Sequence, residues 1–295
     1  MATPNTRSLS VEAPFGTLSA DVSWTGDRDT LHDGHHDAQI VVVWPSVLST
    51  ATVQHRLVGE LAKQFVVVAV DPPGHGRSRI EDPAQLTMLA CARATCDLLE
   101  VAAAYDAEGC VVRWVGTSWG GLVGIEAALA EPSRLTHLTC LNTPFAFEPP
   151  TLLRPAWLPR LARVVGTSSF FSFMTARSFF VPATRSDAAS AEAMSAHRAT
   201  FRDGDRRQLA TALRLVFIDR QDARPSLAEV VTPTLVIGGA HDAMYPIDEQ
   251  RDAARLLPHG SFEVVDSAHI AAVDATDAVL SALHRAWRGE AAPHI

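Results

Sequence analysis

The chain has 295 residues, of which 47% are hydrophobic and 20% are charged, a composition typical of a globular protein. This length suits one large α/β domain with an inserted subdomain, and the net charge of −8 does not suggest a nucleic-acid partner. The apolar runs are too short to cross a bilayer, and residues 1–13 contain no apolar leader. We therefore expect a cytoplasmic protein that binds neither nucleic acid nor membrane.

Short apolar runs alternate along the chain with segments of helical periodicity. Runs rich in β-branched residues predict strands, whereas apolar residues that recur every three or four positions predict helices. The predicted strands are 18–25, 40–44, 65–70, 111–115, 138–142, 234–238 and 261–265, and the predicted helices are 86–104, 122–130, 248–257 and 278–287. This alternation is typical of a mostly parallel, doubly wound α/β sheet with helices on both faces.

The alternation stops at Pro144. Residues 144–226 contain helix candidates separated by prolines and no convincing strand, which predicts a helical cap inserted between two strands. The core then consists of residues 1–143 and 227–295.

The composition of the cap suggests what it binds. It holds nine of the 12 Phe residues, and apolar side chains of a cap often line a substrate pocket. Phe145, Phe147 and Phe173 are our candidates for that lining. The cap also has 12 Arg against 7 acidic residues, which leaves open an anionic substrate held by a guanidinium.

Residues 116–120 read Gly-Thr-Ser-Trp-Gly between a predicted strand and a predicted helix. In this context Gly-x-Ser-x-Gly forms a sharp, strained turn that holds the serine hydroxyl clear of the sheet. Because the residues two before and two after the serine crowd together, both positions favour glycine. Ser118 is therefore the candidate nucleophile. The N–H of Trp119, at a helix N-terminus, is a candidate oxyanion donor.

This turn resembles the nucleophile turn of the α/β-hydrolase superfamily, and the resemblance covers about residues 15–288. Residues 71–78, Asp-Pro-Pro-Gly-His-Gly-Arg-Ser, are similar to the family's Asp-x-x-Gly-x-Gly-x-Ser loop. We expect that loop to have a mainly structural role, because its glycines and prolines fix its shape. His75, which lies within it, is not expected to be a catalytic base.

The resemblance also identifies an acid and a base. Residues 239–246 are similar to the family's Gly-x-x-Asp-x-x-x-Pro segment, which places Asp242 in the acid position. His269 follows the last predicted strand in a segment similar to the family's Ala-His turn. Some relatives carry the acid after the preceding strand, but here that strand ends in Asn142-Thr143, without a carboxylate. Ser118, Asp242 and His269 keep the chain order of this fold.

The chain departs from the family after the strand 40–43. Relatives usually have His-Gly there, whereas this chain reads Trp44-Pro45-Ser46-Val47. Proline has no N–H, so the second oxyanion donor is expected to be Ser46 or Val47. The stretch resembles a similarly non-glycine segment of the 3-oxoadipate enol-lactonases. We also place Trp44 in the substrate pocket.

These residues predict a serine hydrolase that cleaves a carboxylic ester or lactone of a small, mostly apolar molecule through an acyl-enzyme. No cofactor or metal is expected. C–C bond hydrolysis or acyl transfer by the same triad stays open. So does a non-catalytic ligand-binding protein of this fold, although the usual mark of such a protein is a lost triad residue.

Two other groups of residues could suggest metal or redox chemistry. Residues 32–37, His-Asp-Gly-His-His-Asp, lie in a polar turn without a second cluster at ligand spacing, so we interpret them as a solvated loop. The four cysteines match no zinc or redox pattern and are expected to be reduced and mostly buried. They are Cys91, Cys96, Cys110 and Cys140.

Overall fold

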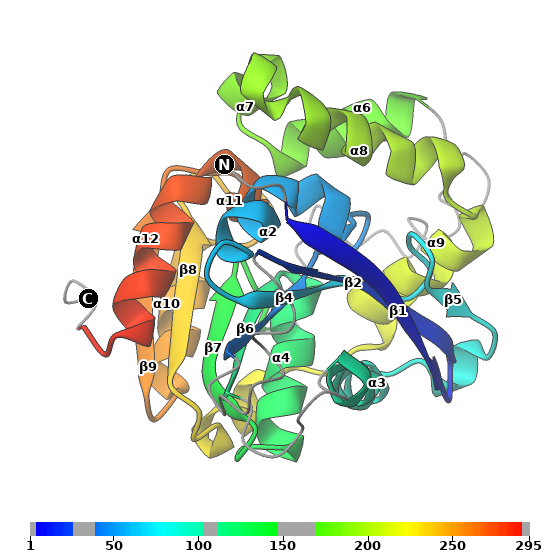
Figure 1. The fold of residues 1–295 in the computed structure, drawn as a ribbon. Coiled ribbons are helices and arrows are strands. Elements are labelled where there is room, and N and C mark those ends of the chain that lie inside the picture. Colours follow the sequence, from blue (N-terminus) through cyan, green and yellow to red (C-terminus); the bar gives the residue numbers. More distant parts are fainter. Residues whose placement is uncertain (1–3, 26–38, 103–110, 147–168, 291–295) are drawn as a thin grey trace.

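The computed structural model describes residues 4–25, 39–102, 111–146 and 169–290 (Figure 1). Its centre is a nine-stranded sheet in the order β1-β2-β4-β3-β6-β7-β8-β9, with β5 paired to β2. The strands are β1 (Asn5–Ala13), β2 (Gly16–Trp24), β3 (Gln39–Trp44), β4 (Val66–Asp71), β5 (Arg79–Ile80), β6 (Val111–Thr117), β7 (Leu135–Leu141), β8 (Thr234–Gly239) and β9 (Gly260–Val265). Along the sheet, the neighbouring strands β4, β3, β6, β7, β8 and β9 all pair in parallel, which confirms the predicted sheet.

Helices cover both faces of the sheet and give two apolar layers. One layer packs α3 (Met88–Ala102), α4 (Trp119–Ala130) and α10 (Ile247–Leu256) on one face. The other packs α2 (His55–Leu61), α11 (Ala271–Asp274) and α12 (Thr276–Trp287) on the opposite face. The side chains of a strand alternate between the layers, as Val42 and Val43 of β3 do.

The described residues between β7 and β8 form helices and no strand. They comprise α6 (Ser169–Phe179), α7 (Pro182–Ser186), α8 (Ala191–Asp203), α9 (Arg206–Arg214), a π-helical turn (Leu215–Asp219) and two 3-10 turns (Ala188–Ser190 and Arg224–Glu229). Figure 1 shows α6, α7 and α8 as a layer of their own beside the sheet and its helices. The helical cap is thus present, while its predicted limits stay a prediction because residues 147–168 lie outside the described ranges.

Hydrogen bonds fasten the cap to the core at several points. The side-chain amide of Gln208 in α9 donates to the Ile80 carbonyl at 2.9 Å and accepts the Ile80 N–H at 2.7 Å. The backbone N–H of Ile270 donates to the Phe179 carbonyl at 3.0 Å. Among the helices that the structure describes, none is long and apolar enough to cross a membrane, and the cytoplasmic location stays a prediction.

Candidate functional site

Ser118 lies on the turn between β6 and α4. Its φ is 55°, in the left-handed region that residues other than glycine seldom adopt. A Cβ on Gly116 would overlap the Gly120 carbonyl, and one on Gly120 would overlap the Trp44 carbonyl. Both glycines are therefore required by close backbone approach, as the sequence predicts. The Ser118 N–H donates to the Leu141 carbonyl at 2.7 Å, which ties the turn to β7.

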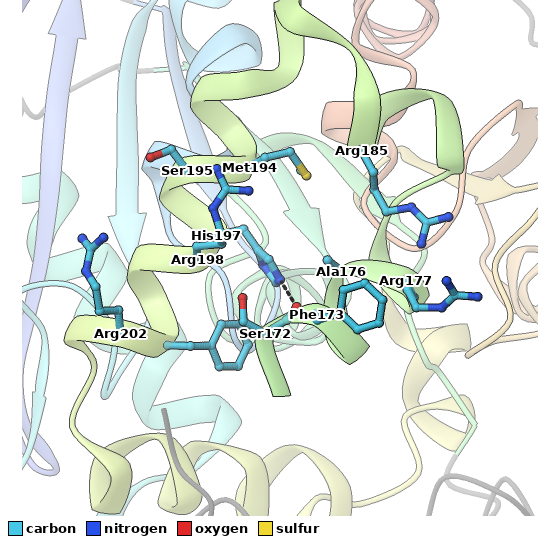
Figure 2. Close-up of a pocket in the computed structure, with 11 residues that line it drawn as sticks. Ser172, Phe173, Ala176, Arg177, Arg185, Met194, Ser195, His197, Arg198 and Arg202 are labelled. Atoms are coloured by element: carbon cyan, nitrogen blue, oxygen red, sulfur yellow. Dashed lines mark hydrogen bonds between the residues drawn. The ribbon is translucent and has the colours of Figure 1, made fainter. Parts of the chain in front are cut away.

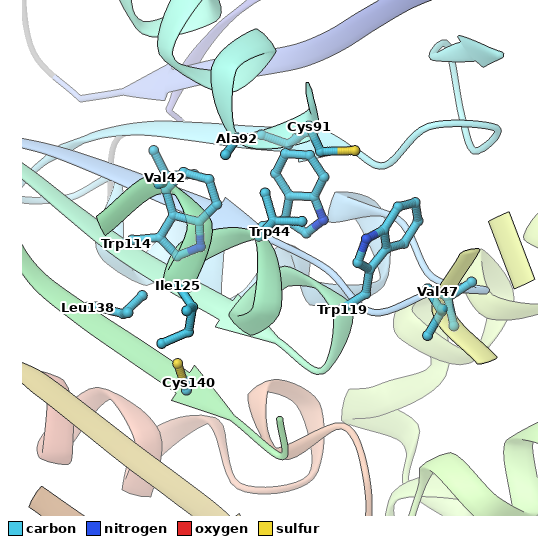
Figure 3. Packing of buried hydrophobic residues seen from close by; sticks show 14 of the residues in the cluster. Val42, Trp44, Val47, Cys91, Ala92, Trp114, Trp119, Ile125, Leu138 and Cys140 are labelled. Atoms are coloured by element: carbon cyan, nitrogen blue, oxygen red, sulfur yellow. The ribbon is translucent and has the colours of Figure 1, made fainter. Parts of the chain in front are cut away.

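Three tryptophans, Trp44, Trp114 and Trp119, pack together next to this turn (Figure 3). Trp44 stacks on Trp114 with ring centroids 5.9 Å apart and meets Trp119 edge-on at 6.2 Å. The Trp114 indole N–H donates to the Gly120 carbonyl at 2.9 Å. All three rings are fully buried. Trp44 is thus a core residue in these contacts, and its predicted place in the substrate pocket gains no support from them.

Asp242 and His269 form a buried pair at the same edge of the sheet. The His269 Nδ1 lies 3.0 Å from Asp242 Oδ2, and the side chains are 1% and 0% exposed, respectively. The other oxygen, Oδ1, accepts the N–H groups of Met244 at 2.8 Å and Tyr245 at 3.3 Å. Burial would raise the pKa of Asp242, but His269 and these hydrogen bonds outweigh it and hold that pKa below its usual value. The carboxylate is therefore ionised at neutral pH.

Asn142 is a site residue that the sequence did not reveal as one. Its Nδ2 donates to Asp242 Oδ2 at 2.9 Å and reaches the Ala268 carbonyl at 3.4 Å. It also has a φ of 48°, and it directly follows Leu141, which binds the Ser118 turn. The end of β7 thus joins the three segments that carry the candidate nucleophile, acid and base.

The carboxylate of Asp266, three residues before His269 in the chain, points away from His269. Its side chain is 89% exposed, and its Oδ1 lies 2.8 Å from Nε2 of His241, which is also exposed. This surface pair leaves Asp242 as the carboxylate beside His269. His241, adjacent to Asp242 in sequence, pairs with Asp266 at the surface and takes no part in the buried pair.

His75 supports the loop that carries Ser46 and Val47, the candidates for the second oxyanion donor. Its Nε2 accepts the Leu48 N–H at 2.9 Å, and its Nδ1 donates to the Pro73 carbonyl at 3.1 Å. A backbone N–H only donates and a carbonyl only accepts, so these bonds fix the neutral tautomer. Burial lowers the pKa of His75 to about 4. Because Leu48 is engaged in this way, Ser46 and Val47 stay the candidate donors.

Two aromatic rings pack beside the candidate base. The rings of Phe179, at the end of α6, and Tyr245 each lie 5.4 Å from the ring of His269. Asp274 adds a polar link, because its Oδ2 accepts the N–H of Ala268 at 2.8 Å and that of Val181 at 3.1 Å. The cap and the loop before His269 therefore share one carboxylate.

The predicted aromatic pocket residues do not gather around this pair. Phe145 is 2% exposed and belongs to the core, whereas Phe173 is 59% exposed and lines a separate cavity in the cap. Phe147 lies outside the described residues. Phe179 makes the contact that was expected of one of these residues. The sequence shows that the cap is rich in phenylalanine, but it does not show which of these residues faces the site.

Several predictions concern residues beyond the described ranges. The segment 32–37 and Cys110 both fall there. Cys91, Cys96 and Cys140 are buried and free, and burial raises the pKa of each thiol, to about 11 for Cys96 and about 12 for Cys140. Within the described ranges, no group of three or more His, Cys, Asp or Glu side chains is placed to hold a metal ion.

Comparison with known proteins agrees with the fold. Residues 40–276 match a family model described as alpha/beta hydrolase fold. The chain is 29% identical over 238 residues to the pimeloyl-(acyl-carrier protein) methyl ester esterase of Xanthomonas campestris, with 78% of this chain and 87% of that protein covered. It is 24% identical over 239 residues to a proposed carbamate hydrolase, RutD, of Pseudomonas savastanoi, covering 79% and 86%.

Solved structures share the fold. A thermophilic esterase from Thermogutta terrifontis superposes with a TM-score of 0.76 at 20% identity, covering 96% of this chain and 98% of that one. The enol-lactonase from Burkholderia xenovorans gives a TM-score of 0.76 at 21% identity, covering 95% and 100%. At these identities the likeness concerns the fold alone.

Proposed function

The chain belongs to the alpha/beta hydrolase fold family, and from this premise we propose that it is a serine hydrolase that cleaves a carboxylic ester or lactone. The observation that carries the proposal is the buried His269–Asp242 pair at the sheet edge where Ser118 occupies its strained turn. The relatives named as methyl ester esterases support an ester as the bond that is cleaved.

In the proposed reaction, the Ser118 hydroxyl attacks the acyl carbon while Nε2 of His269 accepts its proton. The Asp242 carboxylate makes this possible because it binds Nδ1–H and so leaves the lone pair on Nε2. The imidazolium that forms is stabilised by the same carboxylate. It then gives the proton to the leaving oxygen, and an acyl-enzyme remains. Water, deprotonated by His269, releases the acid.

The negative charge that develops on the carbonyl oxygen needs hydrogen-bond donors. Trp119 is the first residue of α4, so its N–H has no acceptor within the helix and can serve as one donor. The second donor is the N–H of Ser46 or Val47, on the loop that His75 holds. Such preorganised donors typically contribute about 10²–10³-fold to kcat each.

The proposed substrate has a substantially apolar acyl group. The rings of Phe179 and Tyr245 beside His269 support an apolar surrounding for the bond that is cleaved. Burial of each methylene stabilises binding by up to about 0.8 kcal/mol, roughly a fourfold gain in affinity. We expect kcat/KM for nitrophenyl esters to rise from acetyl to hexanoyl and to depend little on salt. A preference for acetyl or for carboxylate-bearing esters, weakened by salt, would contradict this part of the proposal.

The nucleophile is tested by covalent labelling. A fluorophosphonate probe should label the wild-type chain, and labelling should disappear in Ser118→Ala and His269→Ala. A matched control is Ser267→Ala. Ser267 lies two residues before His269, and its hydroxyl is buried. Among the described partners, this hydroxyl bonds only to the Ala268 carbonyl. Full labelling of Ser118→Ala would refute the assignment. A panel of nitrophenyl esters, lactones and carbamates then identifies the bond class.

A further inference from the structure

The cap contains a cavity that is not lined by Ser118, Asp242 or His269. It lies between α6 and α8, with α7 at its border, and has a volume of about 560 Å³ (Figure 2). Pockets for small ligands usually measure about 300–1,000 Å³. The cavity is therefore large enough to hold a small organic molecule.

Part of the cavity wall is apolar. Met194 and Phe201 of α8 are almost fully buried, and Ala176 lies opposite on α6. Phe173 also lines the cavity, although 59% of its surface is exposed. A large aromatic side chain with this exposure contributes little to the core. The Arg177 guanidinium lies over one face of its ring, and the rest of the ring offers apolar surface that a ligand could cover.

The rest of the wall is basic. Among the residues that the structure describes, the lining includes four arginines and no Asp or Glu. Figure 2 shows these four arginines spread around the cavity. Arg202 pairs with Asp203, and Arg185 interacts electrostatically with Asp274. In the parts of the chain that the structure describes, Arg177 and Arg198 have no carboxylate within ion-pair distance. The Arg177 guanidinium lies over the Phe173 ring, 5.7 Å from its centroid, and keeps its charge available to an anion.

The cavity is separate from the candidate catalytic residues but close to them. His197 lines the cavity, and the centroid of its ring lies 5.9 Å from that of Phe179. The Phe179 ring in turn contacts the ring of His269. Burial lowers the pKa of His197 to about 4, so this ring is neutral at pH 7. The positive charge of the cavity therefore comes from the arginines.

We propose that this cavity binds a medium-chain fatty-acid anion. The alkyl chain packs against Phe173, Met194 and Phe201, and the carboxylate binds Arg198, with Arg177 adding to the positive potential of the cavity. An inorganic anion would leave the apolar wall uncovered, and a neutral lipid would leave the guanidiniums without a partner. The inference does not depend on hydrolysis, so it can be tested with a chain that lacks the candidate nucleophile.

The test is calorimetric titration of the full Ser118→Ala chain with decanoate, below its critical micelle concentration. We expect saturable binding at one site per chain. Adding Arg177→Gln and Arg198→Gln should weaken it by about tenfold or more, because charge-assisted hydrogen bonds to the carboxylate are lost. Arg207→Gln is the matched control: it removes an exposed charge from α9, outside the cavity, and should change the affinity less than about twofold.

Two further ligands separate the head from the tail. Decanol lacks the charge and butyrate lacks the long chain, so each should bind at least about tenfold more weakly than decanoate. Phe173→Gln should weaken decanoate more than butyrate. The proposal is overturned if decanoate does not bind, if decanol binds equally well, or if the two Arg substitutions leave decanoate affinity unchanged. The last result would place decanoate in the site around Ser118 instead.

Discussion

Replacing His75 with phenylalanine should slow hydrolysis in a chain that still folds. His75 accepts the Leu48 N–H at 2.9 Å, and Leu48 has a φ of 61°, a conformation that a leucine holds only when its surroundings fix it. Phenylalanine retains a ring in this buried position, beside Trp119, but it has no acceptor. The loop that carries Ser46 and Val47 then loses its hydrogen bond to the loop of residues 71–78.

The expected loss follows from that one hydrogen bond. A buried N–H left without an acceptor costs about 1–3 kcal/mol. The loop can avoid this cost by moving, but movement displaces the N–H that is proposed to bind the oxyanion. If the whole cost falls on the transition state, kcat/KM drops by roughly 5- to 150-fold. Complete loss of an oxyanion donor, about 10²–10³-fold, is the upper limit.

The assay is steady-state hydrolysis of nitrophenyl butyrate, with thermal unfolding of each variant measured in parallel. A positioning role predicts that kcat falls while KM changes little, because the oxyanion forms only in the transition state. His75→Gln is the control, since its Oε1 can accept the Leu48 N–H and should restore most of the activity. The reasoning fails if His75→Phe keeps wild-type kcat, or if His75→Gln is equally slow at the same stability.

Three other predictions follow from the same contacts. Asp242→Asn should lower kcat by about 10⁴-fold because it disrupts the tautomer of His269, whereas Asp266→Asn, at an exposed position, should stay within about twofold; the reverse order would identify Asp266 as the acid. Folding lowers the pKa values of His75 and His197 from 6.5 to about 4. Between pH 6.5 and about pH 4, the unfolded chain therefore binds protons at these histidines that the folded chain does not. Urea titrations should show the free energy of unfolding falling by up to about 3 kcal/mol per histidine as the pH drops through this window, and falling less in His75→Gln. Dialysis against a chelator should leave hydrolysis unchanged, and a loss restored by zinc would contradict the metal-free mechanism.

The sequence predicted the parts of the site that depend on local chain geometry. Gly116 is needed because a Cβ there would meet the carbonyl of Gly120, four residues later, and such a local requirement is written in a short motif. The resemblance to family segments identifies Asp242 and His269, and both lie after parallel strands, whose carboxyl ends meet at one sheet edge. Both kinds of inference use residues close together in the chain.

The elements that were missed have weak local signals. In β1 only Leu9 is buried, because β1 is the outermost strand of the sheet, and its mostly polar sequence shows no strong apolar alternation. The helix α2 has seven residues, too few for a clear period. The contacts of Asn142 and Phe179 join residues that are 90 to 126 positions apart, and a single sequence carries no record of such pairs.

The position of the cap and the orientation of the candidate base are set by the same bonds. The Asp274 carboxylate accepts N–H groups from Val181 in the cap and from Ala268, directly before His269. Two residues earlier than Val181, the carbonyl of Phe179 accepts the N–H of the residue directly after His269. Movement of α6 away from the core must break these bonds or carry the loop of His269 with it. A cap held in this way therefore does more than cover the site, because its anchors help to hold the imidazole against Asp242.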